Sequence, residues 1–153
     1  MHFSLFIDID GTKLTDEDRR TLLHPAVSGV ILFSRNFHSI AQLEQLIKEI
    51  KALKTPRLLI SVDQEGGSVQ RFRDPFTNLP SFSSIGQIYK FNPTVGKKIL
   101  VEHASIMVEE LASVGVDFSF TPVVDIGNEK SKVLETRTCL LYTSDAADDS
   151  LRV

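Results

Sequence analysis

The sequence predicts an α/β fold built around a parallel sheet, and three observations support this. Short runs dominated by apolar residues, which suggest buried strands, occur four times, at residues 3–9, 27–33, 58–62 and 116–120. Segments with helical patterning separate these runs, as helical crossovers do between parallel strands. The resulting order, β-α-β-α-β-loop-α-β, fits either a doubly wound sheet or half of a (β/α)₈ barrel.

The first two predicted helices have recognisable beginnings and ends. Thr15 precedes three acidic residues, which favours a helix start, because threonine can cap the first turn and acids there suit the helix dipole. We expect this helix to end at residues 24–25, where a proline follows a histidine. A second helix is predicted from Ser39 until Pro56. Its apolar residues recur at spacings of three and four along one face: Leu43, Leu46, Ile47, Ile50 and Leu53.

A third helix is predicted to begin at Asn92-Pro93, a capping residue followed by a proline in the first turn. Gly115 is its expected C-terminal glycine. The preceding residues 74–92 are rich in Pro, Ser and Phe and are predicted to form a loop. No internal repeat and no linker occurs before residue 127, so the chain is expected to form one domain or part of a larger one.

Composition excludes several classes of function. Of 153 residues, 42% are hydrophobic and 24% charged, which is ordinary for a globular protein. A net charge of −3 gives no electrostatic reason to expect nucleic acid or an anionic membrane as partner. The N-terminus lacks the basic region of a signal peptide, and no apolar run approaches the roughly 18 residues of a membrane span. The single cysteine, Cys139, excludes an internal disulfide, so a cytoplasmic protein is expected.

The most informative segment is residues 58–72. Its apolar run ends in Asp63, and a glycine pair and Arg71 follow. Loops at the ends of parallel strands carry ligand chemistry in α/β folds. A glycine pair lets the backbone approach a ligand closely. A carboxylate and a guanidinium together suit neighbouring hydroxyl groups, so the segment predicts a binding site for a polar small molecule.

A competing motif lies near the N-terminus. An apolar strand ends in Asp8 and Asp10, followed by Gly11-Thr12, and this resembles the first motif of haloacid-dehalogenase-type phosphatases. That resemblance implies Asp8 as the nucleophile, Asp10 as the proton-transfer group and Mg²⁺ between them. No lysine followed by a strand ending in paired acids appears downstream. The structural alternative is that both carboxylates accept hydrogen bonds from turn amides.

The chain as a whole resembles bacterial β-N-acetylglucosaminidases of glycoside hydrolase family 3. Three segments carry this resemblance in order: residues 24–36, the Asp-Gln-Glu-Gly-Gly segment within residues 62–72, and residues 117–125. The segment around Asp8 also fits the opening of that family, so a single resemblance accounts for both motifs. It implies that residues 1–133 are the N-terminal half of a (β/α)₈ TIM barrel, truncated.

The resemblance implies roles for three residues. Asp63 would bind hydroxyl groups of a terminal N-acetylglucosamine, and Arg71 would assist. Arg137 is the candidate for a later arginine that also contacts the sugar, although Glu135 stands where the family has glycine. The implied substrates are cell-wall muropeptides released during peptidoglycan recycling.

No catalytic residue is assigned within this chain, because the family's acid/base histidine, its partner aspartate and its nucleophilic aspartate occur later in a full-length protein. No metal and no organic cofactor is implied. We therefore expect a fragment of a retaining β-N-acetylhexosaminidase that is inactive by itself. A non-catalytic sugar-binding module is the further alternative.

The sequence changes character after about residue 132, so residues 134–153 are predicted to be a junction and a disordered tail. From Cys139 to Asp149 the chain resembles a translated sequencing-library adapter. We therefore expect the residues from about Cys139 onward to be non-native. A disordered acidic tail of the protein itself is the alternative interpretation.

Overall fold

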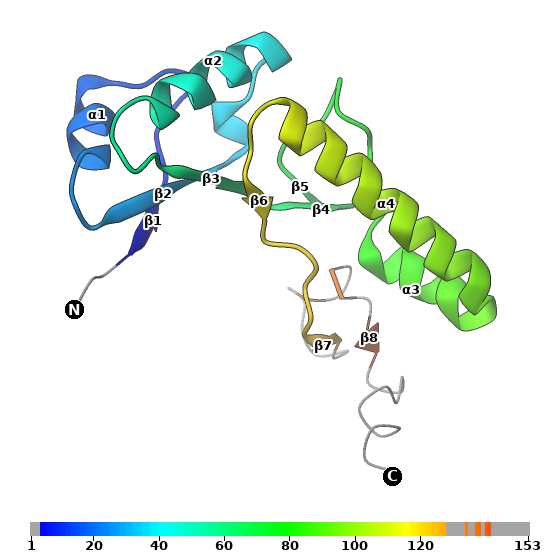
Figure 1. The fold of residues 1–153 in the computed structure, drawn as a ribbon. Helices are drawn as coiled ribbons and strands as arrows, with labels where there is room; N and C mark the ends of the chain where they lie inside the picture. The colour runs from blue at the N-terminus through cyan, green and yellow to red at the C-terminus, as the bar shows by residue number, and fades with distance from the viewer. Residues whose placement is uncertain (1–3, 128–133, 135–136, 139, 142–153) are drawn as a thin grey trace.

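A four-stranded parallel sheet forms the centre of the fold (Figure 1). The structure, a computed structural model, describes residues 4–127, 134, 137, 138, 140 and 141. The sheet order is β1-β2-β3-β6, with the strands β1 (Leu5–Ile7), β2 (Val27–Leu32), β3 (Leu59–Val62) and β6 (Phe118–Ser119). The predicted α/β class is confirmed, and all four strands lie within the apolar runs that predicted them.

Two helices cover one face of this sheet (Figure 1). They are α1 (Asp16–Leu22) and α2 (Ile40–Lys51), and a 3₁₀ turn, Ser34–Asn36, precedes α2. Thr15 and Ser39 cap the two helices with their side chains, as the sequence predicts. A core of buried hydrophobic residues lies between these helices and the sheet. The helix α2 contributes Leu43, Leu46, Ile47 and Ile50, and β2 and β3 contribute Val30, Leu32, Ile60 and Val62.

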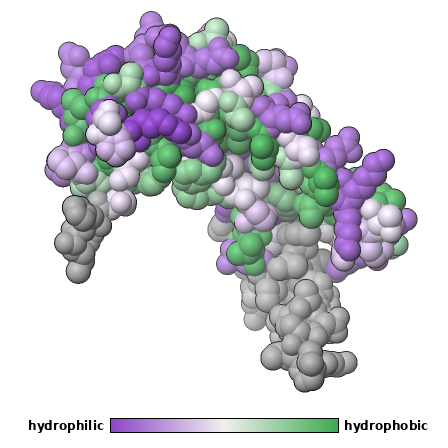
Figure 2. Space-filling view, viewed as in Figure 1, coloured by the Kyte–Doolittle hydropathy of each residue, from purple (hydrophilic) through white to green (hydrophobic). Residues whose placement is uncertain are grey.

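The opposite face of the sheet is open. Phe6 on β1 and Phe118 on β6 lie over it, and their rings meet edge to face with centroids 5.7 Å apart. Gly29 on β2 makes room for this contact, since a Cβ there would lie 2.1 Å from a ring atom of Phe6. Figure 2 shows that hydrophilic residues gather over α1 and α2, whereas the molecule is hollowed on the other side. This open face corresponds to the interior that a closed barrel fills with side chains.

A helical hairpin extends beyond the sheet (Figure 1). It consists of α3 (Phe82–Phe91) and α4 (Pro93–Ser113). The start of α4 after Asn92 and its end before Gly115, which has φ +89°, are confirmed. The prediction of a loop over residues 74–92 is wrong for its second half, where α3 stands. The hairpin packs closely at Gly96, where a Cβ would lie 2.5 Å from the Tyr89 Cα.

Two short strand pairings complete the described fold, and the sequence predicted neither of them. An antiparallel hairpin, β4 (Gln64–Gly66) and β5 (Val69–Gln70), directly follows β3. A two-residue parallel pair joins β7 (Ile126–Gly127) to β8 (Leu140–Leu141). The predicted boundary at residue 133 and most of the predicted tail, Cys139 and residues 142–153, lie outside the described residues. None of the described helices is long and apolar enough to cross a membrane.

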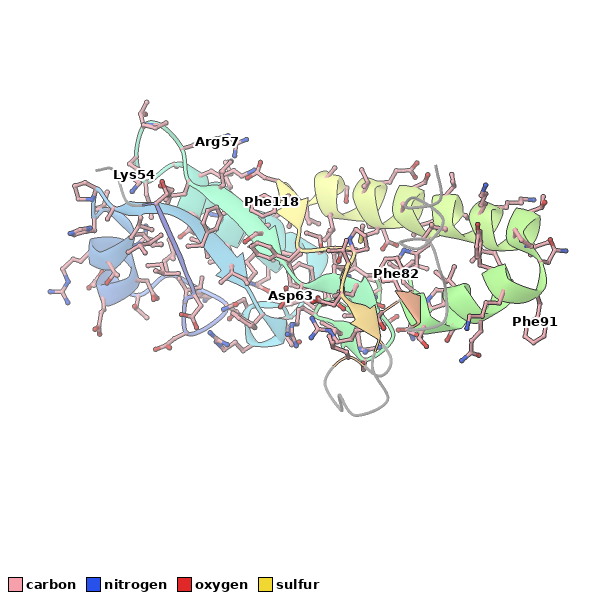
Figure 3. The ribbon with its side chains drawn as sticks, turned by 90° about the horizontal axis from the view of Figure 1, so that it is seen from below. Lys54, Arg57, Asp63, Phe82, Phe91 and Phe118 are labelled. Atoms are coloured by element: carbon pink, nitrogen blue, oxygen red, sulfur yellow. The ribbon has the colours of Figure 1, made fainter. Side chains whose placement is uncertain are left out.

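Asp117 ties the amino ends of β3 and β6 together. Its carboxylate accepts two hydrogen bonds from Arg57, both 2.9 Å, one from Lys51 at 3.1 Å and one from the Ile60 amide at 2.8 Å. Figure 3 shows Arg57 at the end of the sheet away from Asp63. Burial acts to raise the pKa of Asp117, but the hydrogen bonds from Arg57, Ile60 and Lys51 outweigh it, and the pKa falls below its ordinary value.

We expect the Asp117→Asn variant to be less stable at pH 7 by about 2 kcal/mol, because charge-assisted hydrogen bonds are lost. A carboxyl group with a lowered folded-state pKa stabilises the protein above its unfolded pKa, near 4, and this contribution disappears as pH falls through the folded pKa. Urea denaturation of both proteins between pH 7 and pH 3 measures this. The gap between them should narrow below about pH 4, and a gap that stays constant would contradict the assignment.

Candidate functional site

Asp63 and Arg71 meet at the carboxyl end of β3. Asp63 is the first residue after β3, and Arg71 is the first residue after β5, so the β4–β5 hairpin returns the arginine to the aspartate. Arg71 Nη2 lies 3.2 Å from Asp63 Oδ2. The side chain of Arg71 is 30% exposed and that of Asp63 is 22% exposed, so both remain accessible to a ligand. Figure 3 shows Asp63 near the middle of the molecule, beside the hairpin.

The two glycines after Glu65 allow the hairpin to turn. Gly66 and Gly67 have φ of +94° and +58°, values that L-residues with side chains rarely adopt. A Cβ on Gly66 would also lie 2.4 Å from the carbonyl oxygen of Pro80, and the Gly67 amide donates to the Leu79 carbonyl at 2.8 Å. The glycine pair therefore serves close backbone packing as well as the turn.

Gln64 fixes the position of Arg71, a role that sequence analysis missed. Its side-chain oxygen accepts from the backbone amides of Arg71 and Phe72, both at 3.0 Å, and its amide nitrogen donates to the Phe72 carbonyl at 2.9 Å. Gln64 is 1% exposed. A buried glutamine at the end of an apolar strand was the available signal, since a buried amide requires partners.

Two guanidinium groups lie over the ring of Phe33. Its centroid is 5.5 Å from the Arg71 Cζ and 4.7 Å from the Arg35 Cζ. These distances are within the range of cation–π attraction. Arg71 Nε is buried and has no hydrogen-bond partner among the described residues. The Phe33 ring therefore supports a guanidinium that keeps part of its donor capacity unused.

Arg137 lies against Glu65, the next residue but one after Asp63. Its Nε and Nη2 donate to the two carboxylate oxygens of Glu65 at 3.0 and 2.6 Å. The hydrogen bonds that Arg137 donates to Glu65 chiefly raise the pKa of Arg137 above its ordinary value, and the nearby carboxylates of Asp63 and Asp125 add to this effect. The structure thus gathers all three predicted site residues, and Glu65 is a fourth member that sequence analysis missed.

Asp8 and Asp10, the residues of the phosphatase alternative, line a different cleft. It has a volume of about 220 Å³ between β1 and α1, and its other acidic residues are Glu17 and Asp18. No lysine or arginine lines this cleft. Arg35, which is not among the lining residues, forms an ion pair with Asp8. Within the described ranges, no three His, Cys, Asp or Glu side chains are grouped so that they could hold a metal ion.

A parallel α/β sheet with carboxylates and arginines gathered at the carboxyl ends of its strands defines part of a barrel-type protein with a polar ligand site. Residues 5–145 match the family model described as "Glycosyl hydrolase family 3 N terminal domain". The chain belongs to this family.

Relatives with established names agree with this assignment. The chain is 49% identical over 133 residues to the beta-hexosaminidase of Thioalkalivibrio sulfidiphilus, covering 87% of this chain and 38% of the relative. It is 50% identical over 133 residues to that of Nitrosomonas eutropha, with the same coverage of 87% and 38%. The chain therefore spans little more than a third of the length of these relatives.

Solved structures give the same result. NagZ from Neisseria gonorrhoeae, in complex with N-trifluoroacetyl-D-glucosamine, superposes with a TM-score of 0.87 at 41% identity, covering 91% of this chain and 41% of that one. Native NagZ from the same organism gives a TM-score of 0.86 at 42% identity, covering 88% of this chain and 40% of that one. The predicted family and the predicted half-barrel architecture are confirmed, and the phosphatase alternative gains no support.

Proposed function

We propose that this chain supplies the sugar-binding half of a retaining β-N-acetylhexosaminidase, with Asp63, Arg71 and Arg137 holding a terminal N-acetylglucosamine. The observation that carries the proposal is the convergence of these three residues. They come from the end of β3, the end of β5 and the region after β6. Asp63 pairs with Arg71, and Glu65, two residues after Asp63, pairs with Arg137. The NagZ structure with an N-acylated glucosamine analogue supports an amino-sugar as ligand.

The charges of the site suit a neutral sugar. Asp63 and Arg71 form one ion pair and Glu65 and Arg137 another, so these four groups carry no net charge. A neutral polyhydroxylated ligand needs donors and acceptors at fixed positions, and paired charges provide both. The acidic cleft beside Asp8 offers no comparable donors. Muropeptides of cytoplasmic peptidoglycan recycling are the proposed natural substrates.

In the proposed reaction a carboxylate traps the sugar covalently while a second group protonates the leaving oxygen. We place both of these groups outside this chain. The residues described here would bind and orient the sugar, and the chain by itself is expected to show no hydrolysis.

The experiment is a fusion of residues 1–138 to the part of the T. sulfidiphilus beta-hexosaminidase that follows its matched segment, hereafter the completed protein. We expect the completed protein to hydrolyse an aryl N-acetyl-β-glucosaminide with retention of configuration, and the 153-residue chain to show no hydrolysis. An aryl β-glucoside and an aryl phosphate serve as comparison substrates. Binding of N-acetylglucosamine without turnover would favour the non-catalytic module, and Mg²⁺-dependent phosphate release lost in Asp8→Asn would favour the phosphatase.

A further inference from the structure

Glu65 is a buried carboxylate at the edge of the proposed sugar site. It lies on β4 between Gln64 and Gly66, and only 2% of its side chain is exposed. A carboxylate removed from water is unfavourable unless a cation and hydrogen bonds compensate it. Glu65 therefore needs a cationic partner at this position.

Arg137 is that partner. Glu65 engages its Nε and Nη2 edge at 3.0 and 2.6 Å. A guanidinium carries five N–H groups, and in the described part of the chain three of those of Arg137 donate to no acceptor. The Arg137 side chain is 28% exposed against 2% for Glu65, so the arginine, unlike the carboxylate, is partly accessible.

Asp63 and Glu65 are neighbours in this arrangement. They are two residues apart in the chain, and Gln64 between them makes its hydrogen bonds within the hairpin. The Asp63 carboxylate acts electrostatically on Arg137. The free edge of Arg137 and the Asp63–Arg71 pair therefore belong to one site.

The local backbone helps to place Arg137. Its amide donates to the Leu134 carbonyl at 3.0 Å, and the Thr138 amide donates to the same carbonyl at 3.3 Å, which forms a turn around the arginine. Glu65 and Arg137 are 72 residues apart in the sequence. Of the described contacts, the Glu65 carboxylate is the one that fixes the arginine side chain itself.

We propose that Glu65 is a positioning residue for sugar binding: its carboxylate holds the Arg137 guanidinium with the free N–H edge toward the site and cancels its charge. This inference rests on the proposed function, because it gives Arg137 a sugar to bind. Glu65 itself does not contact the sugar and acts only through Arg137.

The test is a double-variant cycle in the completed protein with Glu65→Gln, Arg137→Gln and both together. The readouts are kcat/KM for the aryl N-acetyl-β-glucosaminide, the inhibition constant of N-acetylglucosamine and the thermal unfolding midpoint. Each single variant should weaken sugar affinity and kcat/KM by about tenfold or more. The double variant should be no worse than Arg137→Gln, since Glu65 has no effect without its arginine.

The unfolding midpoint separates positioning from a purely structural role. Glu65→Gln leaves Arg137 unpaired and should lower the midpoint, whereas the double variant removes both charges and should recover part of it. Under the proposal, sugar affinity stays low in the double variant although stability returns. Glu49→Gln is the matched control, because it breaks the Arg19–Glu49 pair of 2.7 Å on the outer face and should leave sugar affinity unchanged.

Three results would overturn the inference. They are a wild-type inhibition constant in Glu65→Gln, recovery of sugar affinity in the double variant, and losses in the two single variants that multiply in the double variant. Failure of the proposed function looks different, because the unmodified completed protein would then neither bind nor hydrolyse the N-acetylglucosaminide. A protein in which Asp63→Asn loses binding while Glu65→Gln keeps it would retain the proposed function and refute only the positioning role.

Discussion

Replacement of Asp63 by asparagine in the completed protein is expected to reduce kcat/KM for the aryl N-acetyl-β-glucosaminide by about a thousandfold. In the proposed complex the carboxylate accepts hydrogen bonds from two sugar hydroxyl groups, each worth about 1.5–3 kcal/mol because the acceptor is charged. The loss of about 4 kcal/mol corresponds to a factor of about 10³. The variant also leaves Arg71 without the partner at 3.2 Å that now fixes it.

The inhibition constant of N-acetylglucosamine should rise together with this loss, and steady-state kinetics with the sugar as competitor measures both. Asp74→Asn is the matched control. It removes a carboxylate from an exposed position three residues after Arg71 and should leave both values near wild type. An Asp63→Asn protein with wild-type affinity for N-acetylglucosamine would remove Asp63 from the site.

The Phe72→Ala variant is expected to be less stable by about 4 kcal/mol, in the range for large-to-small changes in a packed core. Phe72 has no exposed surface, and its ring packs against Phe37 and Phe76 with centroids 5.2 and 5.5 Å away. Its backbone also anchors Gln64, the residue that holds the Arg71 amide. Sugar affinity should therefore weaken as well as stability.

Urea denaturation and the inhibition constant of N-acetylglucosamine measure the two effects in the completed protein. Phe91→Ala is the control, because Phe91 is 93% exposed at the junction of α3 and α4 (Figure 3); the change should alter stability by less than about 0.5 kcal/mol. Equal effects of the two substitutions on the inhibition constant would show that the packing around Phe72 does not support the sugar site.

The sequence was most informative where burial imposes a pattern. Helices cover the strands β2 and β3, whose runs are mostly apolar, with one serine in each, and were easy to recognise. The capping residues Thr15, Ser39 and Asn92 predicted helix starts because each cap is a local interaction with its own first turn. The helix α3 was missed because its serines and glycine have low helix propensity. It is stabilised by packing against α4.

The site could be predicted only in part. Asp63 and Arg71 are separated by one hairpin, so their proximity followed from a short segment. The contact between Glu65 and Arg137 spans 72 residues, and a single sequence carries no information about such a pairing. Gln64 was missed for another reason: its partners are backbone groups, and backbone groups do not differ between sequences.

The contact between Phe6 and Phe118 has a consequence for assembly. Adjacent strands are spaced about 4.8 Å apart, so the first and fourth strands of a flat sheet would be roughly 14 Å apart. Side chains standing upright on a flat surface at that separation would not bring their rings to a centroid distance of 5.7 Å. Phe6 instead leans over Gly29 of β2 to reach Phe118 on β6. The two edge strands of the described sheet are thus in contact across its open face before any further strand is added.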